Sequence, residues 1–271
     1  MGKVISLKRF VILITLFIVV LGTQGCAPKG NPEEVINKYF QSVKDSKYTD
    51  AYDLLTDKTK ESLSLKDFKL WQEQTKEIVE FLDFKSKKVE SGKDIALNGI
   101  TYPHYVMFDV EEINKEYYLG QEQTDVARHY VVADNGNWRL FRNPDIKQAL
   151  ANNYMSLGAM YIDGRGKEQD VKKAAENFGK ALETDPELID AHYSLGVTYM
   201  IMGKYDDSIR EVTMYLEKSK DNEGKSEALN VIGLAYKSKG EFIKAKEAFE
   251  QSIAFNPENE FAKRHIESVT R

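Results

Sequence analysis

The sequence predicts an α+β domain followed by an all-α array of helical repeats. Apolar residues recur at every third or fourth position after Pro32, which is typical of amphipathic helices. The segment "YPHYVMFDVEEI", residues 102–113, alternates with a period of two, which is typical of a half-buried strand. Three glycines, Gly158, Gly196 and Gly233, mark a frame that recurs after 38 and then 37 residues. A chain of 271 residues is long enough for about two domains.

The segment from Pro32 to about Leu82 is predicted to be helical. Proline at the first helical position and acidic residues in the first turn favour a helix start at Pro32. A second helix is expected in "YTDAYDLLT". A third is expected in "SLKDFKLWQEQTKEIVEFL", where Ser64 and Asp67 form a near capping box. Three helices are therefore expected before the sheet.

Residues from about 84 to 142 are predicted to form an antiparallel sheet. One face of the alternating segment is mostly apolar and holds Tyr102, His104, Val106, Phe108 and Val110. Further along, "DVARHYVVADNGNWRLF" contains two strand-like runs joined by Asn135-Gly136, a pair that favours a tight hairpin turn. Pro103 has no N–H to donate, so it is expected at an edge or a bulge.

Helices followed by a meandering sheet, with "AYDLL" after the first helix and a closing "NGNWRLF", resemble the NTF2-like family over about residues 32–143. The resemblance implies a cone of helices against a strongly bent sheet. Its hollow is a ligand or catalytic pocket in some relatives and a filled core in others, and the fold alone does not choose between them. Four tyrosines either line a pocket or fill a core: Tyr102, Tyr105, Tyr117 and Tyr118. A cavity of about 300 Å³ or more with converging polar groups favours the pocket.

The C-terminal part contains an internal repeat. Small and aromatic residues recur in a fixed order, with Ala174, Phe178, Ala181 and Pro186 matched by Ala245, Phe249, Ser252 and Pro257. This pattern resembles the tetratricopeptide repeat, with three copies over about residues 151–257 and a last helix, "NEFAKRHIESV", capping the stack. The first copy carries four extra residues in its inner turn and resembles the Sel1-like variant.

The resemblance implies a concave face built mainly from the first helix of each pair, a surface suited to binding a peptide or a helix. The family frame places the following partner-binding residues on that face: Met155, Tyr193, Val197, Met200, Asn230, Leu234 and Lys237. The pattern of Lys and Asn that clamps a C-terminal carboxylate in chaperone-binding relatives is absent. The alternative is that these residues pack against the final helix or the N-terminal domain.

The first 25 residues have the order of a secretory signal. Lys3, Lys8 and Arg9 precede an apolar run over residues 10–22, and small Gly25 comes directly before Cys26, the single cysteine of the chain. A membrane-spanning helix needs about 20 apolar residues, and this run is shorter. An uncleaved anchor or a buried helix is the alternative.

The residues before Cys26 resemble the lipobox of bacterial lipoproteins, in which the cysteine carries a diacylglyceryl group and becomes the first mature residue. Thr23 stands where that signal usually has leucine. The resemblance implies a lipid anchor on Cys26, with palmitate-type chains, on the extracytoplasmic (periplasmic) side of the cell membrane or outer membrane. We expect a signal peptide at residues 1–25, a tether at 26–31, the NTF2-like domain at 32–145, and three repeats with the capping helix at 146–271.

Charge and motif content narrow the function. A net charge of −5 argues against a nucleic-acid-binding surface, which is usually basic. The four histidines have no metal-ligand spacing, and no nucleotide-binding glycine motif occurs, so no metal, cofactor or catalytic residue is predicted. Two functions compete: a membrane-anchored scaffold that binds a protein or peptide partner through its repeats, and a pocket protein that binds or transforms a small molecule in the cone.

Overall fold

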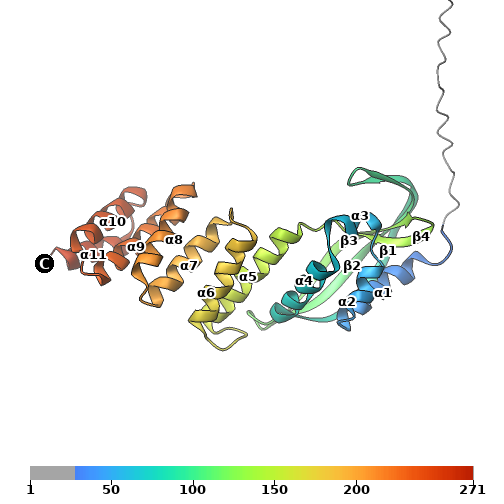
Figure 1. Cartoon of the computed structure of the whole chain (residues 1–271), viewed down its shortest axis with the longest axis horizontal. Coiled ribbons are helices and arrows are strands. Elements are labelled where there is room, and N and C mark those ends of the chain that lie inside the picture. Colours follow the sequence, from blue (N-terminus) through green and yellow to red (C-terminus); the bar gives the residue numbers. More distant parts are fainter. Residues whose placement is uncertain (1–27, 271) are drawn as a thin grey trace, which may run out of the picture.

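The structure is a computed structural model that describes residues 28–270, so the predicted signal peptide and Cys26 lie outside the described residues. In this part of the chain an α+β domain is followed by a row of helices (Figure 1), as the sequence predicts. No helix within residues 28–270 is both long enough and apolar enough to cross a membrane.

Four helices precede the sheet: α1 (Pro32–Lys44), α2 (Tyr48–Asp53), α3 (Asp57–Ser62) and α4 (Leu65–Ile78). The expectation of three helices missed α3. The side chain of Thr56 accepts a hydrogen bond from the Thr59 amide, which starts this short helix separately. The predicted Ser64 cap is confirmed, because its hydroxyl accepts from the Asp67 amide at 3.1 Å.

The predicted third helix ends at Ile78 and not at about Leu82, so that prediction is wrong at its C-terminal end. Val79 is extended, with φ −133° and ψ 145°, and it pairs with Glu116 as the first residue of strand β1. Phe81 and Phe84 follow in the strand and lie near Phe40 of α1, with ring centroids 6.4 and 5.5 Å away. Aromatic residues that pack against α1 therefore favour the strand over another helical turn.

Four strands form one antiparallel sheet in sequence order: β1 (Val79–Leu97), β2 (Ile100–Glu116), β3 (Gln121–Asp134) and β4 (Asn137–Phe141). Asn135 and Gly136 form the predicted turn between β3 and β4, and both have positive φ, 48° and 77°. Pro103 lies in β2 beyond the β2–β3 ladder, which starts at Tyr105, so its missing N–H costs no bond to β3.

The core of this domain lies between the helices and one face of the sheet. The predicted apolar face of β2 is confirmed, since Tyr102, Val106, Phe108 and Val110 are buried and His104 is half-buried. Residues from α1, α2, α4, β3 and β4 complete the core, among them Ile36, Phe40, Ala51, Phe68, Val131 and Leu140. His129 of β3 is also buried on this side, edge-to-face with Phe40.

The C-terminal part consists of seven helices: α5 (Ile146–Asp163), α6 (Val171–Thr184), α7 (Ile189–Ile201), α8 (Tyr205–Lys218), α9 (Asn222–Ser238), α10 (Phe242–Phe255) and α11 (Glu260–Val269). Figure 1 shows them following one another away from the sheet. The frame glycines lie where paired helices touch. A Cβ on Gly158 would be 2.5 Å from the Phe178 ring, and one on Gly233 would be 2.6 Å from the Phe249 ring. The glycines therefore admit the aromatic side chains of the second helices.

The extra residues of the first repeat lie against the N-terminal domain. They follow α5, and Gly166 among them touches the backbone of Tyr117 in the turn between β2 and β3. Lys167 forms an ion pair with Glu77 of α4 at 3.0 Å. The inserted loop thus connects the helical array to the sheet.

Candidate functional site

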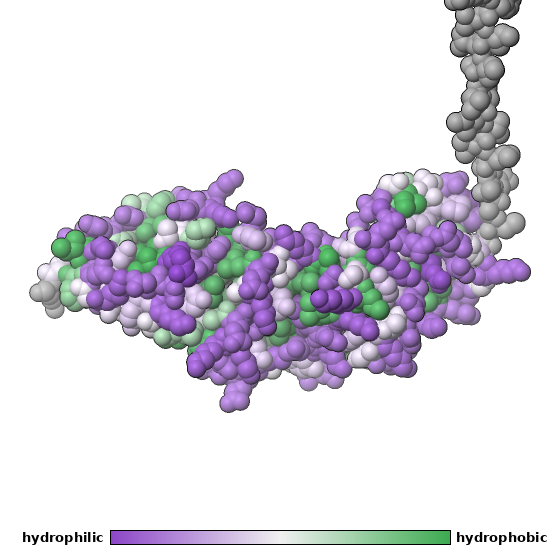
Figure 2. All heavy atoms as spheres, in the orientation of Figure 1, coloured by the Kyte–Doolittle hydropathy of each residue, from purple (hydrophilic) through white to green (hydrophobic). Residues whose placement is uncertain are grey.

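Three of the predicted partner-binding residues form a row on α7. Tyr193, Val197 and Met200 are spaced by four and three residues, so they share one face of the helix, and all three are half-buried. Ile201 follows at the end of this face and is 58% exposed. We call Tyr193, Val197, Met200 and Ile201 the α7 row. Figure 2 shows apolar areas between hydrophilic side chains on the visible face of the helical array.

Tyr193 reaches from the α7 row into the packing between repeats. Its ring centroid is 5.2 Å from that of Tyr215 on α8, and it packs against the cluster formed by α8 and α9. Burial raises the pKa of the Tyr193 hydroxyl, and the nearby Glu227 and Tyr215 add to this shift. One side of Tyr193 therefore supports the array.

The other predicted partner-binding residues contact neighbouring helices. Met155 of α5 packs against the cluster of Ala174, Phe178 and Leu195.

The three residues on α9 face the C-terminal helices. The Asn230 side-chain oxygen accepts a hydrogen bond from the Ser252 hydroxyl at 2.9 Å, and Leu234 packs against the cluster that contains Phe249. Lys237 Nζ donates to the Ser268 hydroxyl of α11 at 2.8 Å. The predicted apolar residues Met155, Tyr193, Val197, Met200 and Leu234 are all half-buried, and the exposed apolar side chain beside them is Ile201, which was not among the predicted residues.

A second candidate site is a cavity inside the α+β domain. It lies between α1, α4 and the start of the sheet and has a volume of about 380 Å³. We call it the N-terminal cavity. Its apolar wall includes Phe40, Trp71 and Phe81, and its polar groups include Glu112 and Arg142. The volume and the converging polar groups meet the criterion that favours a pocket over a filled core.

Two charged residues of the N-terminal cavity, Glu112 and Arg142, have no partner of opposite charge among the described residues within ion-pair distance, whereas Lys44 pairs with Asp83 at 3.1 Å. Arg142 follows β4, and its guanidinium carbon lies 5.8 Å from the ring centre of Tyr39 and 5.9 Å from that of Trp71. No hydrogen bond or ion pair links the side chain of Glu112 or Arg142 to another residue of the described chain. Burial raises the pKa of Glu112, and the positive charge of Arg142 partly opposes this shift.

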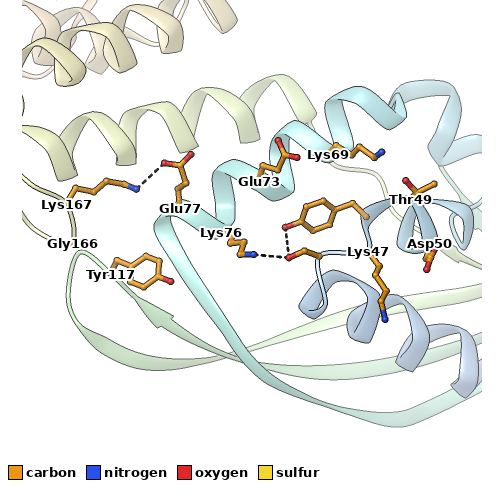
Figure 3. A pocket seen from close by; sticks show the side chains of 12 residues that line it. Lys47, Thr49, Asp50, Lys69, Glu73, Lys76, Glu77, Tyr117, Gly166 and Lys167 are labelled. Atoms are coloured by element: carbon orange, nitrogen blue, oxygen red, sulfur yellow. Dashed lines mark hydrogen bonds and ion pairs between the residues drawn. The ribbon is translucent and has the colours of Figure 1, made fainter.

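The N-terminal cavity opens toward a wider groove of about 930 Å³ between the two parts of the chain. We call it the junction groove. Figure 3 shows its side chains, which come from the turn between α1 and α2, from α2 and α4, and from Tyr117 and the inserted loop. Four residues line both spaces: Ser46, Tyr48, Lys76 and Tyr117. The junction groove holds the charged residues Lys47, Lys69, Lys76, Lys167, Asp50, Glu73 and Glu77. Charged side chains therefore line the space that adjoins the N-terminal cavity.

The four tyrosines divide between the two predicted roles, and two of them, Tyr117 and Tyr118, lie in the turn after β2 and not in a strand. Tyr102 is buried in the core, and Tyr117 lines both the N-terminal cavity and the junction groove. The hydroxyl of Tyr105 bonds to Glu90, and that of Tyr118 bonds to Asp163 of α5. Only one of the four therefore lines the pocket.

The sequence analysis did not single out Glu112 or Arg142. Glu112 continues the alternating face of β2 that holds Val106, Phe108 and Val110, so a carboxylate follows the apolar positions on the core side. That change from apolar to acidic on an inward face was the available signal. Nothing in the local sequence relates Arg142 to Glu112. In residues 28–270, no group of three or more His, Cys, Asp or Glu side chains is placed to hold a metal ion.

Comparison with known proteins identifies one repeat. The family model of the tetratricopeptide repeat matches residues 226–259, which span α9 and α10, so a tetratricopeptide repeat is present there. No curated protein matches the sequence.

Among solved structures, the chain is similar to the second TPR domain of human RPAP3, which was solved in complex with an HSP70 peptide. The two sequences are 16% identical, and the TM-score is 0.40. The match covers 48% of this chain and 99% of that chain. It is also similar to the N-terminal domain of stress-induced protein-1 from C. elegans, with 19% identity, coverage of 47% and 100%, and a TM-score of 0.41. The Arabidopsis OM64 TPR domain is similar with 14% identity, coverage of 45% and 96%, and a TM-score of 0.41.

Proposed function

We propose that the chain is a protein-interaction module whose helical repeats bind a protein or peptide partner on the face that contains the α7 row. The tetratricopeptide repeat at residues 226–259 supports this, because stacked helical pairs of this kind present extended binding surfaces. The observation that carries the proposal is the apolar α7 row, where Ile201 stays 58% exposed beside three half-buried residues. An exposed isoleucine that continues a row of half-buried apolar side chains suits an apolar partner surface.

Site-specific photocrosslinking tests this proposal. A benzophenone amino acid replaces Ile201, and in a matched control it replaces Ile243, which is 78% exposed on α10, the second helix of its pair. We expect one dominant protein adduct from position 201 and none of the same mass from position 243. Equal adducts from both positions, or none from position 201, would contradict the proposed face.

The proposal includes a lipid anchor at Cys26 on the extracytoplasmic side of a membrane. Its support is the order of charged, apolar and small residues that ends at the single cysteine. The test is a Cys26→Ser variant, which we expect to leave the membrane fraction or to accumulate as an uncleaved precursor. Mass spectrometry of the membrane-bound chain decides the point: an unmodified Cys26 preceded by residues 1–25 contradicts the anchor.

A second candidate function is small-molecule binding in the N-terminal cavity, with the repeats as a scaffold. The observation that favours it is a cavity of about 380 Å³ in which Glu112 and Arg142 meet aromatic walls. The order of helices and meandering strands supports an NTF2-like cone for this domain. The proposal contains no catalytic step. A titration of the chain with small molecules, described below, tests this second function independently of the repeats.

A further inference from the structure

Arg142 determines the chemical class of molecule that the N-terminal cavity accepts, an assignment that rests on the second candidate function above. Its guanidinium lies beside the rings of Tyr39 and Trp71, and no carboxylate of the described residues lies within ion-pair distance of it. A guanidinium presents five N–H donors in a plane and binds carboxylates through two of them at once. Arg142 therefore has charged N–H donors that no carboxylate of the described residues accepts.

Glu112 is the other charged residue deep in the N-terminal cavity. It lies on the core face of β2, where burial favours its neutral form. A protonated carboxyl group donates a hydrogen bond, whereas an ionised one only accepts. Burial thus opposes the ionisation of Glu112, so this residue repels a bound carboxylate less than an exposed glutamate would, and Arg142 supplies the charged donors of the cavity.

The walls of the N-terminal cavity are aromatic. Phe40, Trp71 and Phe81 come from α1, α4 and β1, and Val43 and Val79 lie among them. Such a wall packs against the apolar part of a ligand, and the polar end of the ligand can then contact the charged residues. At the mouth, Lys76 donates to the Ser46 hydroxyl at 3.0 Å and adds positive charge on the path inward.

We propose that the N-terminal cavity binds a small organic carboxylate with an apolar body, its carboxylate on Arg142 and its body against Phe40, Trp71 and Phe81. The volume of about 380 Å³ lies at the lower end of the usual range for small-molecule pockets. An ammonium ligand would meet the positive charges of Arg142 and Lys76. A fully apolar ligand would leave Arg142 without an acceptor, which is costly in a partly desolvated site.

Isothermal titration calorimetry of the purified chain tests the class with three probes that share one body: 3-phenylpropionate, 3-phenylpropionamide and 3-phenylpropylamine. We expect the carboxylate to bind at least tenfold more tightly than the amide, and the amine to show no binding. NMR of the Val43 and Val79 methyl groups locates the bound probe, because both residues line the N-terminal cavity.

Two variants and a matched control assign the contacts. Arg142→Gln should weaken carboxylate binding at least tenfold. Arg128→Gln should leave it unchanged, because Arg128 pairs with Asp109 at 2.9 Å and does not line the N-terminal cavity. Glu112→Gln replaces a carboxyl that can ionise with a neutral side chain that has an N–H donor, so carboxylate binding should be at least as tight as in the unmodified chain.

The possible outcomes distinguish a wrong ligand class from a cavity that binds no small molecule. If the amide or the amine binds as well as the carboxylate, with shifts at Val43 and Val79, the N-terminal cavity is a pocket but the carboxylate class is wrong. Equal weakening by Arg142→Gln and Arg128→Gln, or loss of binding in Glu112→Gln, also overturns the assignment. If no probe binds, both this inference and the pocket function fail, while the proposal for the α7 row is unaffected.

Discussion

Gly166, in the inserted loop of the first repeat, lies against the backbone of Tyr117 in the turn between β2 and β3: a Cβ at position 166 would be 2.7 Å from the carbonyl carbon and oxygen of Tyr117. This close approach is made by a residue of the segment in which the first repeat departs from the regular frame. The four extra residues let the loop reach the N-terminal domain, where Lys167 and Glu77 form their ion pair. A regular inner turn would end before this contact.

The substitution Gly166→Ala should therefore weaken the connection between the two parts. Gly166 has φ +70°, so alanine is strained there, and its Cβ also meets the Tyr117 backbone. Gly240→Ala is the matched control, because Gly240 has φ +78° with nothing within 4 Å of a Cβ. We expect both variants to lose about 1 kcal/mol from the left-handed backbone, and Gly166→Ala to lose about 1–3 kcal/mol more. Thermal unfolding measures both, and equal losses would show that the contact with Tyr117 contributes nothing.

The packing of the third repeat gives a second prediction. Phe249 is fully buried and its ring fills the space above Gly233, so Phe249→Ala should reduce the free energy of unfolding by about 3–5 kcal/mol. Phe255→Ala is the control on the same helix, where the ring is 39% exposed and the loss should be smaller. Urea unfolding followed by circular dichroism compares them. Similar midpoints for the two variants would contradict the packing of this repeat.

The charge of Glu112 gives a third prediction. Its pKa in the folded chain is raised, mainly by burial, with Arg142 lowering it and Asp125 raising it; Tyr39 of α1 is the other titratable group beside it. A raised pKa of a carboxyl means that its contribution to stability is complete below its ordinary pKa and is lost as pH rises through the folded-state pKa. Glu112→Gln should therefore raise the free energy of unfolding at pH 7 by about 1–2 kcal/mol and have little effect at pH 4.

Glu111→Gln is the control for this measurement. Glu111 is the preceding residue of β2 and is exposed, on the other face of the sheet. Its substitution should change stability little at either pH. A stabilisation of Glu112→Gln that is equally large at pH 4 and pH 7 would show that ionisation of Glu112 is not its cause.

His129 gives a fourth prediction with the opposite sign in pH. Burial, helped by the positive charge of Arg142, lowers the pKa of His129 from 6.5 to about 3, while Asp109 acts in the other direction. The unfolded chain takes up a proton near pH 6.5 and the folded chain does not, so stability is complete above that pH and falls as pH drops toward about 3. Each pH unit in this window costs up to about 1.4 kcal/mol.

His129→Phe should flatten this acid dependence, because phenylalanine has no titratable nitrogen. It also removes Nε2, a buried atom without a hydrogen-bond partner in the described structure, and keeps a ring near Phe40. Unfolding curves at pH 7, 5.5 and 4.5 compare the two chains, and NMR of the His129 ring protons reports its protonation directly. Protonation of His129 near pH 6.5 in the folded chain would contradict the prediction.

Local sequence patterns predicted the elements that local chemistry determines. The Asn135-Gly136 turn follows from residues that tolerate positive φ, and the helical pairs follow from glycines that recur opposite Phe178 and Phe249. The end of α4 was not predicted, because "EIVEFL" fits a helical and a strand pattern alike. Its partners decide the outcome: Val79 pairs with Glu116, far away in sequence.

The N-terminal cavity was harder to predict than the fold. The resemblance to a cone raised the two alternatives of pocket and core, but the choice depends on which side chains fill the space. Glu112 and Arg142 come from different ends of the sheet region and meet only after β2, β3 and β4 are paired. Likewise, the repeat frame placed Asn230 on a binding face without indicating its bond to Ser252. Such contacts depend on tertiary structure.

The last prediction concerns the partner surface on the α7 row. Aromatic residues near the centre of an interface often cost at least 2 kcal/mol when truncated, so Tyr193→Ala should weaken binding of the partner crosslinked at position 201 by a factor of about 30 or more. Because Tyr193 also packs against Tyr215, loss of folding could mimic this result.

Ile201→Asp avoids that problem, since Ile201 is 58% exposed, and it should weaken binding with unchanged thermal unfolding. Ile243→Asp on α10 is the control and should bind normally, while Lys237→Ala should change mainly the salt dependence. If the partner binds Tyr193→Ala and Ile201→Asp as tightly as the unmodified chain but is lost from Arg142→Gln, the working site lies in the N-terminal domain and the repeats are its scaffold.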